Sequence, residues 1–418
     1  MARGQRPCPS LPGMKTILAA ALALIAATAS AKSVLIERID VNAAKRISPE
    51  IVIAETRLDA GKSYTDEQIE QAVNRVRRLP FVLFAAAELK PGSTPEARVL
   101  RINIEETANF NWSLGMDAVA HQRGGSGNGA DVRGGVGYHF FPGRHGMLDA
   151  FVADTNEAIV ANTLREGGVA YNGWGLFGTR AYGSVAVGTV FRTNGRHDVN
   201  PSALLGVPLT RTQSIEASFA RTTSRLERSA SGIADPIRSS SRITDYALTW
   251  LLQTTNDPYF ARDGFDLRAG PAWERDKLEL PFVLTFPKPA HVIEDKTSQR
   301  HLLFIAGGAK YWPLRESSAA WVRADATTRR VTGTTNGNAF PAQRQNVGDV
   351  LVGLAHDFNR ELGESGQSRT RLEFGLGYHV DRIRPGSTRD NTGPEVEIGY
   401  AYRNRFGLVH ITVSFVSR

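Results

Sequence analysis

The sequence predicts a mainly β protein, in which a transmembrane antiparallel β-barrel of about sixteen strands follows one small α/β domain. Three observations predict this fold class. The chain opens with a secretory signal, and residues 33–107 show the helix and strand periods of a compact domain. The remainder is a series of short alternating segments between glycine-rich turns. Because no apolar run of about 18 residues follows the signal, we expect strands and not helices to cross the bilayer.

The N-terminus has the three-part layout of a secretory signal. Lys15 precedes an apolar stretch, and Ala31 ends a small-x-small cleavage site. We therefore expect residues 1–31 to be a signal peptide cleaved before Lys32, with residues 1–13 an over-extended start. The alternative is a buried N-terminal helix.

Charge and cysteine content agree with export. The only cysteine, Cys8, lies in the signal, so a mature chain has no disulfide and no thiolate-ligated metal, as suits the oxidising periplasm. The formal net charge is +8 and the pI is about 9.7. Since an exported chain does not meet nucleic acid, we expect no nucleic-acid partner and assign the basic residues to loops and the barrel interior.

Residues 32–107 are expected to form the small domain, with the order β-α-α-β-β. Ser48 is an N-cap followed by Pro49 at the first helical position. Thr65 and Gln68 have the spacing of a capping box, and Pro80 ends the helix that they open. The expected elements are strands at 34–41, 81–89 and 98–105 and helices at 49–56 and 65–79.

The helix at 65–79 has two faces. Its apolar residues recur at helical spacing and should pack on the sheet: Ile69, Ala72, Val73, Val76 and Leu79. Its polar residues should face solvent: Glu70, Asn74, Arg75 and Arg78.

Residues 108–418 are expected to form the barrel. The clearest segment is 371–380, where apolar residues at even positions alternate with polar residues and glycine, and 215–219, 246–252 and 396–402 show similar faces. Lipid outside and water inside require this pattern. A secreted β-sandwich is the alternative, because it shows the same alternation. The number of segments and the aromatic residues near segment ends favour the membrane. These aromatic residues are Trp112, Tyr138, Trp250, Tyr311 and Tyr402.

The small domain resembles a POTRA domain. The resemblance lies in the element order, in Gly61-Lys62-Ser63-Tyr64-Thr65 between the helices, in Leu79-Pro80-Phe81-Val82, and in a last strand ending Ile104-Glu105-Glu106. POTRA domains are the periplasmic modules of the BamA/TamA outer-membrane assembly superfamily.

The barrel also resembles this family in one turn. Residues 256–264 are similar to the sequence D-N-P-Y-F-P-T-R-G in barrels of BamA relatives and patatin-linked homologues, with Asp257, Pro258 and Gly264 matching. Asp-Pro followed by Gly suits a tight periplasmic hairpin, because Pro fixes φ and Gly admits positive φ.

The last segment resembles the C-terminal strand by which the assembly machinery recognises barrel precursors. Its apolar residues share one face, which should contact lipid: Gly407, Val409, Ile411, Val413 and Phe415.

The resemblance implies a protein of the Gram-negative outer membrane, with its N-terminal domain in the periplasm, that inserts or translocates polypeptides. Its implied partners are outer-membrane lipid, polypeptide clients or a periplasmic or secreted partner bound by strand addition to the domain, and the barrel assembly machinery during biogenesis. The family's Val-Arg-Gly-Phe/Tyr loop is not found between Tyr311 and Asp357. The alternative is therefore a passive pore or structural surface antigen that keeps the fold without the assembly activity.

We expect no enzyme, no cofactor and no metal. The segment 173–178 matches G-x-G-x-x-G, but a strand-like segment follows where a nucleotide site needs a helix, so we assign a hairpin. His139, His379 and His410 lie in strand-like segments without a spacing that pairs them with serine, and the histidines show no H-x-x-x-H spacing. A membrane esterase is the weaker third interpretation.

The cleavage site yields a first prediction. The mature protein should begin at Lys32, which N-terminal sequencing of the membrane-bound protein measures. Ala31→Leu should leave unprocessed precursor, because the residue before the cut must be small. Lys32→Gln is the matched control and should be processed normally. A mature chain that retains residues before Ala31 contradicts the assignment.

Overall fold

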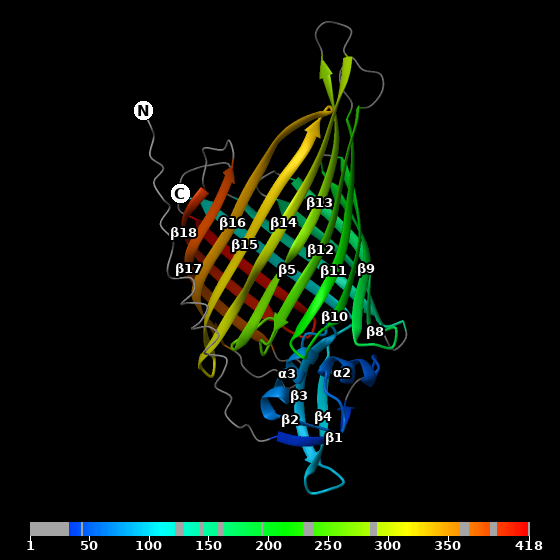
Figure 1. Ribbon diagram of the computed structural model, residues 1–418, viewed down its shortest axis with the longest axis vertical. Helices are drawn as coiled ribbons and strands as arrows, with labels where there is room; N and C mark the ends of the chain where they lie inside the picture. The colour runs from blue at the N-terminus through cyan, green and yellow to red at the C-terminus, as the bar shows by residue number, and fades with distance from the viewer. Residues whose placement is uncertain are drawn as a thin grey trace, which may run out of the picture.

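The computed structural model describes residues 33–42, 45–121, 129–142, 146–157, 162–193, 195–228, 237–284, 291–358, 368–384 and 391–416. The expected cleavage site between Ala31 and Lys32 lies outside them. Over these residues the chain forms a small α/β domain and a closed barrel, as predicted (Figure 1). No helix within the described ranges is long and apolar enough to cross a bilayer.

The small domain is a four-stranded sheet of order β2-β1-β4-β3 with two helices. The pair β1 and β4 is parallel, and the other two pairs are antiparallel. The expected order β-α-α-β-β is incomplete, because a short strand at 62–65 pairs with the first strand and buries Tyr64. The elements are β1 (Ser33–Asn42), α2 (Pro49–Thr56), β2 (Lys62–Thr65), α3 (Asp66–Val76), β3 (Val82–Pro91) and β4 (Ala97–Glu106).

The domain core follows the predicted pattern. Ser48 caps α2, and Thr65 with Gln68 forms the predicted capping box at the start of α3. The five apolar residues expected to pack on the sheet are all buried. The helix α3 ends at Val76, earlier than expected, and the amide of Leu79 bonds to the carbonyl of Val76 in a tighter final turn.

The expected solvent face of α3 is confirmed for Glu70, which is exposed, and is wrong for the other three residues. Asn74 and Arg75 are only 5% and 4% exposed, and the side chain of Arg78 is 15% exposed. Arg75 lies against α2, where its Nε donates to the carbonyl of Glu55 at 3.1 Å, and Arg78 lies against the barrel, where its Nη2 donates to the carbonyl of Thr255 at 3.0 Å. Helical periodicity showed that the face is polar, but other parts of the protein cover most of it instead of water.

The barrel has fifteen strands, each paired in antiparallel fashion with the next along the chain, and the ring closes through a parallel pair of β19 and β5. Closure by a parallel pair follows from the odd number, since alternate strands reverse direction. The strands are β5 (Phe110–His121), β6 (Gly129–Phe140), β7 (Gly146–Glu157), β8 (Asn162–Leu176), β9 (Ala181–Arg192), β10 (Arg196–Pro208), β11 (Gln213–Arg228), β12 (Ile237–Gln253), β13 (Gly264–Leu284), β14 (His291–Arg315), β15 (Ser318–Thr335), β16 (Asn338–Asp357), β17 (Arg369–Arg384), β18 (Asn391–Arg403) and β19 (Gly407–Val416).

The expected number of about sixteen strands, all antiparallel, is therefore corrected to fifteen with one parallel pair. The strands β13 and β14 contain 21 and 25 residues, whereas a membrane crossing needs about 9–11. Both strands extend beyond the end of the barrel opposite the domain (Figure 1). Because one such strand is about twice as long as a membrane crossing, the number of alternating segments in the sequence does not equal the number of strands.

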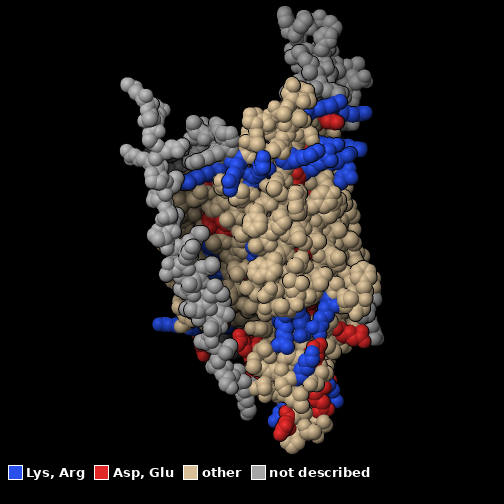
Figure 2. Space-filling model, viewed as in Figure 1, with Lys and Arg blue, Asp and Glu red and all other residues tan. Residues whose placement is uncertain are grey.

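The outer face of the barrel is apolar, as the alternation predicted. Even-numbered residues of β17 are exposed, from Leu372 at 43% to Tyr378 at 51%, whereas Arg371 is buried on the inner side. Figure 2 shows an uncharged belt around the middle of the visible barrel face, with Lys and Arg above and below it. The assignment of Tyr311 to the aromatic belt of the outer face is wrong. Its side chain faces the lumen and packs on Trp321, whereas the neighbouring Trp312 points outward.

The register of β19 assigns a face to each of its residues. Val413 pairs with Ile398 and Phe415 with Val396, on the outer face, and Phe415 is 47% exposed. Thr412 pairs with Gly399 on the inner face. The strand runs parallel to β5, away from the small domain. The role of this strand as an assembly signal stays a prediction.

These faces give a prediction for two adjacent residues. Ile411→Arg places a charge in lipid, which costs about 2–4 kcal/mol at the midplane, so we expect a sharp loss of assembled barrel. Thr412→Arg is the matched control and should assemble nearly as well as wild type, because its charge stays in the lumen. The measurement is the amount of heat-modifiable protein in the membrane fraction. Equal amounts for the two variants would contradict the assigned faces.

Candidate functional site

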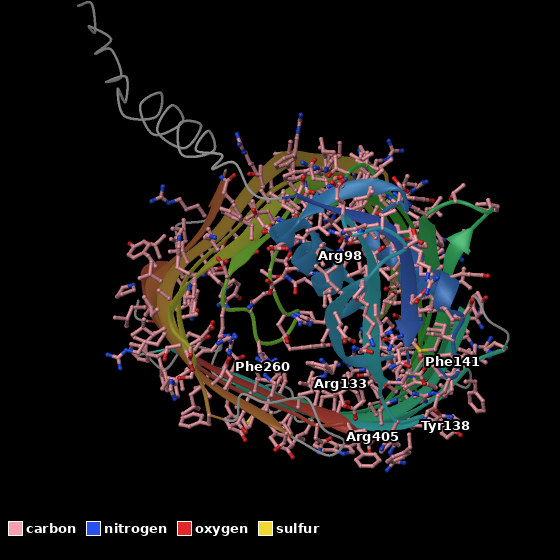
Figure 3. All side chains as sticks on the ribbon, turned by 90° about the horizontal axis from the view of Figure 1, so that it is seen from below. Arg98, Arg133, Tyr138, Phe141, Phe260 and Arg405 are labelled. Atoms are coloured by element: carbon pink, nitrogen blue, oxygen red, sulfur yellow. The ribbon has the colours of Figure 1, made fainter. Side chains whose placement is uncertain are left out.

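The small domain sits on one mouth of the barrel, and its core continues into the barrel wall. Phe81 is fully buried, and the rings of Phe141 and Trp174 lie edge-on to it at 6.1 and 5.4 Å. Met147, at the start of β7, belongs to the same buried cluster. Figure 3, seen from the domain side, shows Phe141 at the ring of strands beneath the domain. The domain is therefore held by apolar packing as well as by its linker.

Arginine side chains fasten the domain to the backbone of the barrel turns. Arg57, the left-handed C-cap of α2, donates from Nη1 to the carbonyls of Thr210 at 2.7 Å and Gln213 at 3.2 Å. Arg77 donates to the carbonyl of Asn256 at 3.1 Å. The neighbouring Arg75 bonds within the domain, where its Nε donates to the carbonyl of Glu55. Burial lowers the pKa of the Arg75 guanidinium to about 9. Arg75 therefore remains charged near neutral pH.

Contacts also run from the barrel to the domain. Arg180, in the turn between β8 and β9, donates to Asp59 at 2.6 Å, and Arg403 at the end of β18 donates to the carbonyl of Val82 at 3.2 Å. Arg211 lies 4.6 Å from the ring centre of Tyr64. Turns from separate parts of the barrel thus hold one domain.

The loop at 254–263, which contains the predicted family-like turn, closes another part of the mouth. It is longer than the tight hairpin that we expected. Asp257 Oδ1 accepts from the amides of Tyr259 at 2.8 Å and Phe260 at 2.9 Å, so the Asp-Pro pair starts a turn. Gly264 has φ of 100°, and a Cβ there would collide with the carbonyl of Thr254. The positive φ predicted for this glycine is confirmed.

The loop folds inward and is anchored on β17. The buried ring of Phe260 lies 4.5 Å from the guanidinium of Arg369 and 5.6 Å from that of Arg371. Arg369 donates to Asp257 at 2.7 Å, and Arg371 donates to the carbonyl of Ala261 at 2.9 Å. Figure 3 shows Phe260 and its loop inside the ring of strands. Cation–π contacts and ion pairs therefore hold the loop in the mouth.

A buried ion pair underlies this anchor. Arg371 Nε donates to Asp357 at 2.6 Å, with side chains only 2% and 1% exposed. Removing one partner of such a pair typically costs about 3–5 kcal/mol. Burial alone would raise the pKa of Asp257, but Arg369 and two backbone amides hold it below its ordinary value. The loop carboxylate therefore stays ionised against β17.

A small cationic cavity remains between the domain and the loop. Its volume is about 160 Å³, and it is lined by Arg77, Arg262, Arg369 and Arg403 as well as Asp257. Sequence alternation placed Arg371 on the polar face of the segment 371–380, but nothing in the sequence showed that a loop between β12 and β13 would meet it.

The G-x-G-x-x-G segment is a hairpin, as expected. It spans the end of β8 and the turn before β9, where Gly175, Phe177 and Gly178 all have positive φ. Phe177 is 90% exposed. A strand and not a helix follows, so no helix N-terminus is available to bind a phosphate there.

The three histidines singled out in the sequence lie on the luminal face. His139 contacts Asp149 and Asn111, and His379 contacts Asp349. His410 pairs across the sheet with the buried Ala401.

The pair Ser318 and His356 was not predicted. Ser318 Oγ lies 2.9 Å from His356 Nδ1, directly across from it between β15 and β16. The pair borders an outward groove of about 540 Å³. Within the described residues no carboxylate bonds to the other ring nitrogen of His356.

Residues 311–357, where the family's Val-Arg-Gly loop would lie, consist of strands and short turns. Residues 316–317 and 336–337 connect the strands from β14 to β16, and Asn336 and Gly337 both have positive φ, as a tight hairpin requires. No segment between Tyr311 and Asp357, all of which the structure describes, folds back into the barrel.

No protein-family model matches the sequence, and no curated protein matches it. Among solved structures the chain is similar to BamA from Haemophilus ducreyi lacking POTRA domains 1–3, with 11% identity, a TM-score of 0.39, and 91% of this chain and 80% of that chain covered. It is also similar to CdiB from Acinetobacter baumannii, with 10% identity, a TM-score of 0.45, and 88% of this chain but 60% of that chain covered. These likenesses concern the fold alone.

The docked arginines give a third prediction. A hydrogen bond from a charged group contributes about 1.5–3 kcal/mol, so Arg57→Ala with Arg78→Ala should loosen the domain. We expect a broad-specificity protease to cut the linker at 107–109 at least about tenfold faster in detergent-solubilised protein. The matched control, Arg38→Ala with Arg98→Ala, removes the same charge from two sites away from the barrel, of which Arg38 is exposed and Arg98 is half-buried. Equal cleavage rates would show that these arginines do not fasten the domain.

Proposed function

We propose that this protein acts in the Gram-negative outer membrane, where it inserts or translocates polypeptides received by a POTRA-like domain in the periplasm. The observation that carries the proposal is the small domain fixed over the barrel mouth with a sheet edge left open. A closed barrel with an apolar outer belt supports the membrane location. The resemblance of residues 32–107 to POTRA domains supports the periplasmic side.

The sheet has two edge strands, and β3, with ten residues, offers a longer edge than β2, with four. Among the described strands β3 pairs only with β4, so its second edge has no strand partner. Close to the barrel this edge is occupied, because the carbonyls of Val82 and Ala85 accept from Arg403 and Arg77. Further along, Glu88 and Leu89 are exposed. An extended client segment can add there as a fifth strand, through main-chain hydrogen bonds that do not depend on its sequence.

The position of this edge suits the delivery of a client polypeptide to the barrel rim. The strand β3 starts beside Arg403, the last residue of β18, and β18 is next to the closing strand β19. A client paired along β3 therefore ends near the barrel rim. The salt bridge of Glu88 and Lys90, at 3.5 Å, places charge on the free edge, a common protection against non-specific strand pairing.

A passive pore or structural surface antigen is the second candidate. It is favoured by the absence of a fold-back loop in residues 311–357. The covered mouth argues against a wide open pore, since the domain and the inward loop both occupy it. The two candidates differ in whether client protein contacts the domain.

Site-specific photo-crosslinking with gene deletion tests the proposal. A crosslinker at Glu88 should capture exported polypeptides in living cells. The matched control is Leu35, an exposed residue of β1 that is paired with Ser63 of β2 on one side and with Ala97 of β4 on the other. Deletion should reduce specific outer-membrane or secreted proteins, and wild-type protein should restore them. An unchanged proteome together with no difference between the two crosslinking sites would reject the proposal in favour of the pore or surface antigen.

A further inference from the structure

Three polar side chains from adjacent strands converge on the luminal wall of the barrel. Asp349 lies on β16, His379 on β17 and Glu395 on β18, and one ligand atom from each lies within 4.8 Å of the other two. Asp349 and His379 are directly paired across the sheet, and Glu395 lies opposite Gly377, two residues before His379. We propose that these residues form a binding site for one divalent transition-metal ion.

The state of Glu395 points to a ligand. Its residue is 8% exposed, yet Oε2 has no hydrogen-bond partner among the described residues. A buried carboxylate is costly unless it is paired or coordinates a metal. The neighbouring cation is engaged elsewhere, because Arg323 bonds to Glu397. His379 contacts Asp349. Among the described residues, the two carboxylates and the imidazole of this cluster have no bonded arginine or lysine.

A second cluster on the same luminal face provides the contrast. Glu274, Asp276 and His301 also lie within metal-ligand distance of one another. There Arg329 donates to both Glu274, at 2.7 Å, and His301 Nδ1, at 2.6 Å from its Nε. The guanidinium supplies the positive charge and occupies the imidazole nitrogen. Asp276 Oδ1 also lacks a hydrogen-bond partner among the described residues, but this cluster already contains a bonded cation, whereas the one around Glu395 does not.

The ligand set indicates the class of ion. One imidazole nitrogen and two carboxylate oxygens suit Zn²⁺ and similar divalent transition metals, for which carboxylate oxygens and imidazole nitrogens bind at about 2.0–2.2 Å. Water from the lumen can complete the coordination. The His379 contact to Asp349 would give way to shared coordination, and the ion would link three successive strands. The spacing of histidines along the sequence could not reveal this site, because each ligand comes from a different strand.

Titration of tag-free, detergent-solubilised full-length protein with Zn²⁺ tests the site. Wild type should bind one equivalent, and Glu395→Gln and His379→Gln should each weaken binding at least about tenfold. The matched control is His301→Gln in the second cluster, which should bind as wild type does. Heat-modifiable migration selects folded protein for every titration, so a variant that fails to fold is replaced by Asp349→Asn.

The outcomes are distinct. Loss of the bound equivalent of Zn²⁺ in Glu395→Gln and His379→Gln, but not in His301→Gln, supports the site. Absence of saturable binding by wild type, unchanged binding by Glu395→Gln and His379→Gln, or loss of binding in His301→Gln would overturn it. Since no client protein takes part in the titration, its result is independent of the proposed insertion or translocation role.

Discussion

Every strand of this barrel needs a partner on both edges, because lipid offers no hydrogen bonds to the backbone. In a series of hairpins this requirement makes the first and last strands partners. With fifteen strands both run in the same direction, so closure uses parallel pairing from Gly407 opposite Trp112 to Val416 opposite His121. Parallel pairing is slightly less stable per residue than antiparallel pairing. The seam between β19 and β5 is therefore the least stabilised pair per residue in a ring that must stay closed.

The direction of β5 also determines where the small domain lies. The strand β4 ends at Glu106 and β5 begins at Phe110, so the linker spans at most about 3.6 Å per residue and keeps the domain at the mouth. A short linker holds the two parts at high effective concentration, so individually modest contacts suffice to dock them. The domain therefore meets turns distant in sequence, including those that contain Phe141, Arg180 and Thr210, because these hairpin turns lie at the end of the barrel where it is docked.

Local signals predicted much of this fold. The caps at Ser48 and Thr65 and the two-residue alternation placed helices and faces, because these patterns depend on neighbours in the chain. They did not show what covers a face. Arg78 was expected in solvent because periodicity separates polar from apolar residues, and periodicity cannot distinguish water from a docked barrel. Tyr311 was assigned to the outer aromatic belt although its parity places it inside, where Trp321 packs on it.

The candidate site depends on neighbours that only strand register and loop conformation bring together. Alternation predicts that Arg371 faces inward, but a buried guanidinium is costly until it is paired. Asp357, opposite it on β16, supplies one partner, and the loop at 254–263 supplies a carbonyl and the face of Phe260. The family-like turn is therefore held in the mouth by charged side chains of β17. The same reasoning explains why the luminal carboxylates were not recognised as clusters, since residues on separate strands become neighbours only when the pairing register is known.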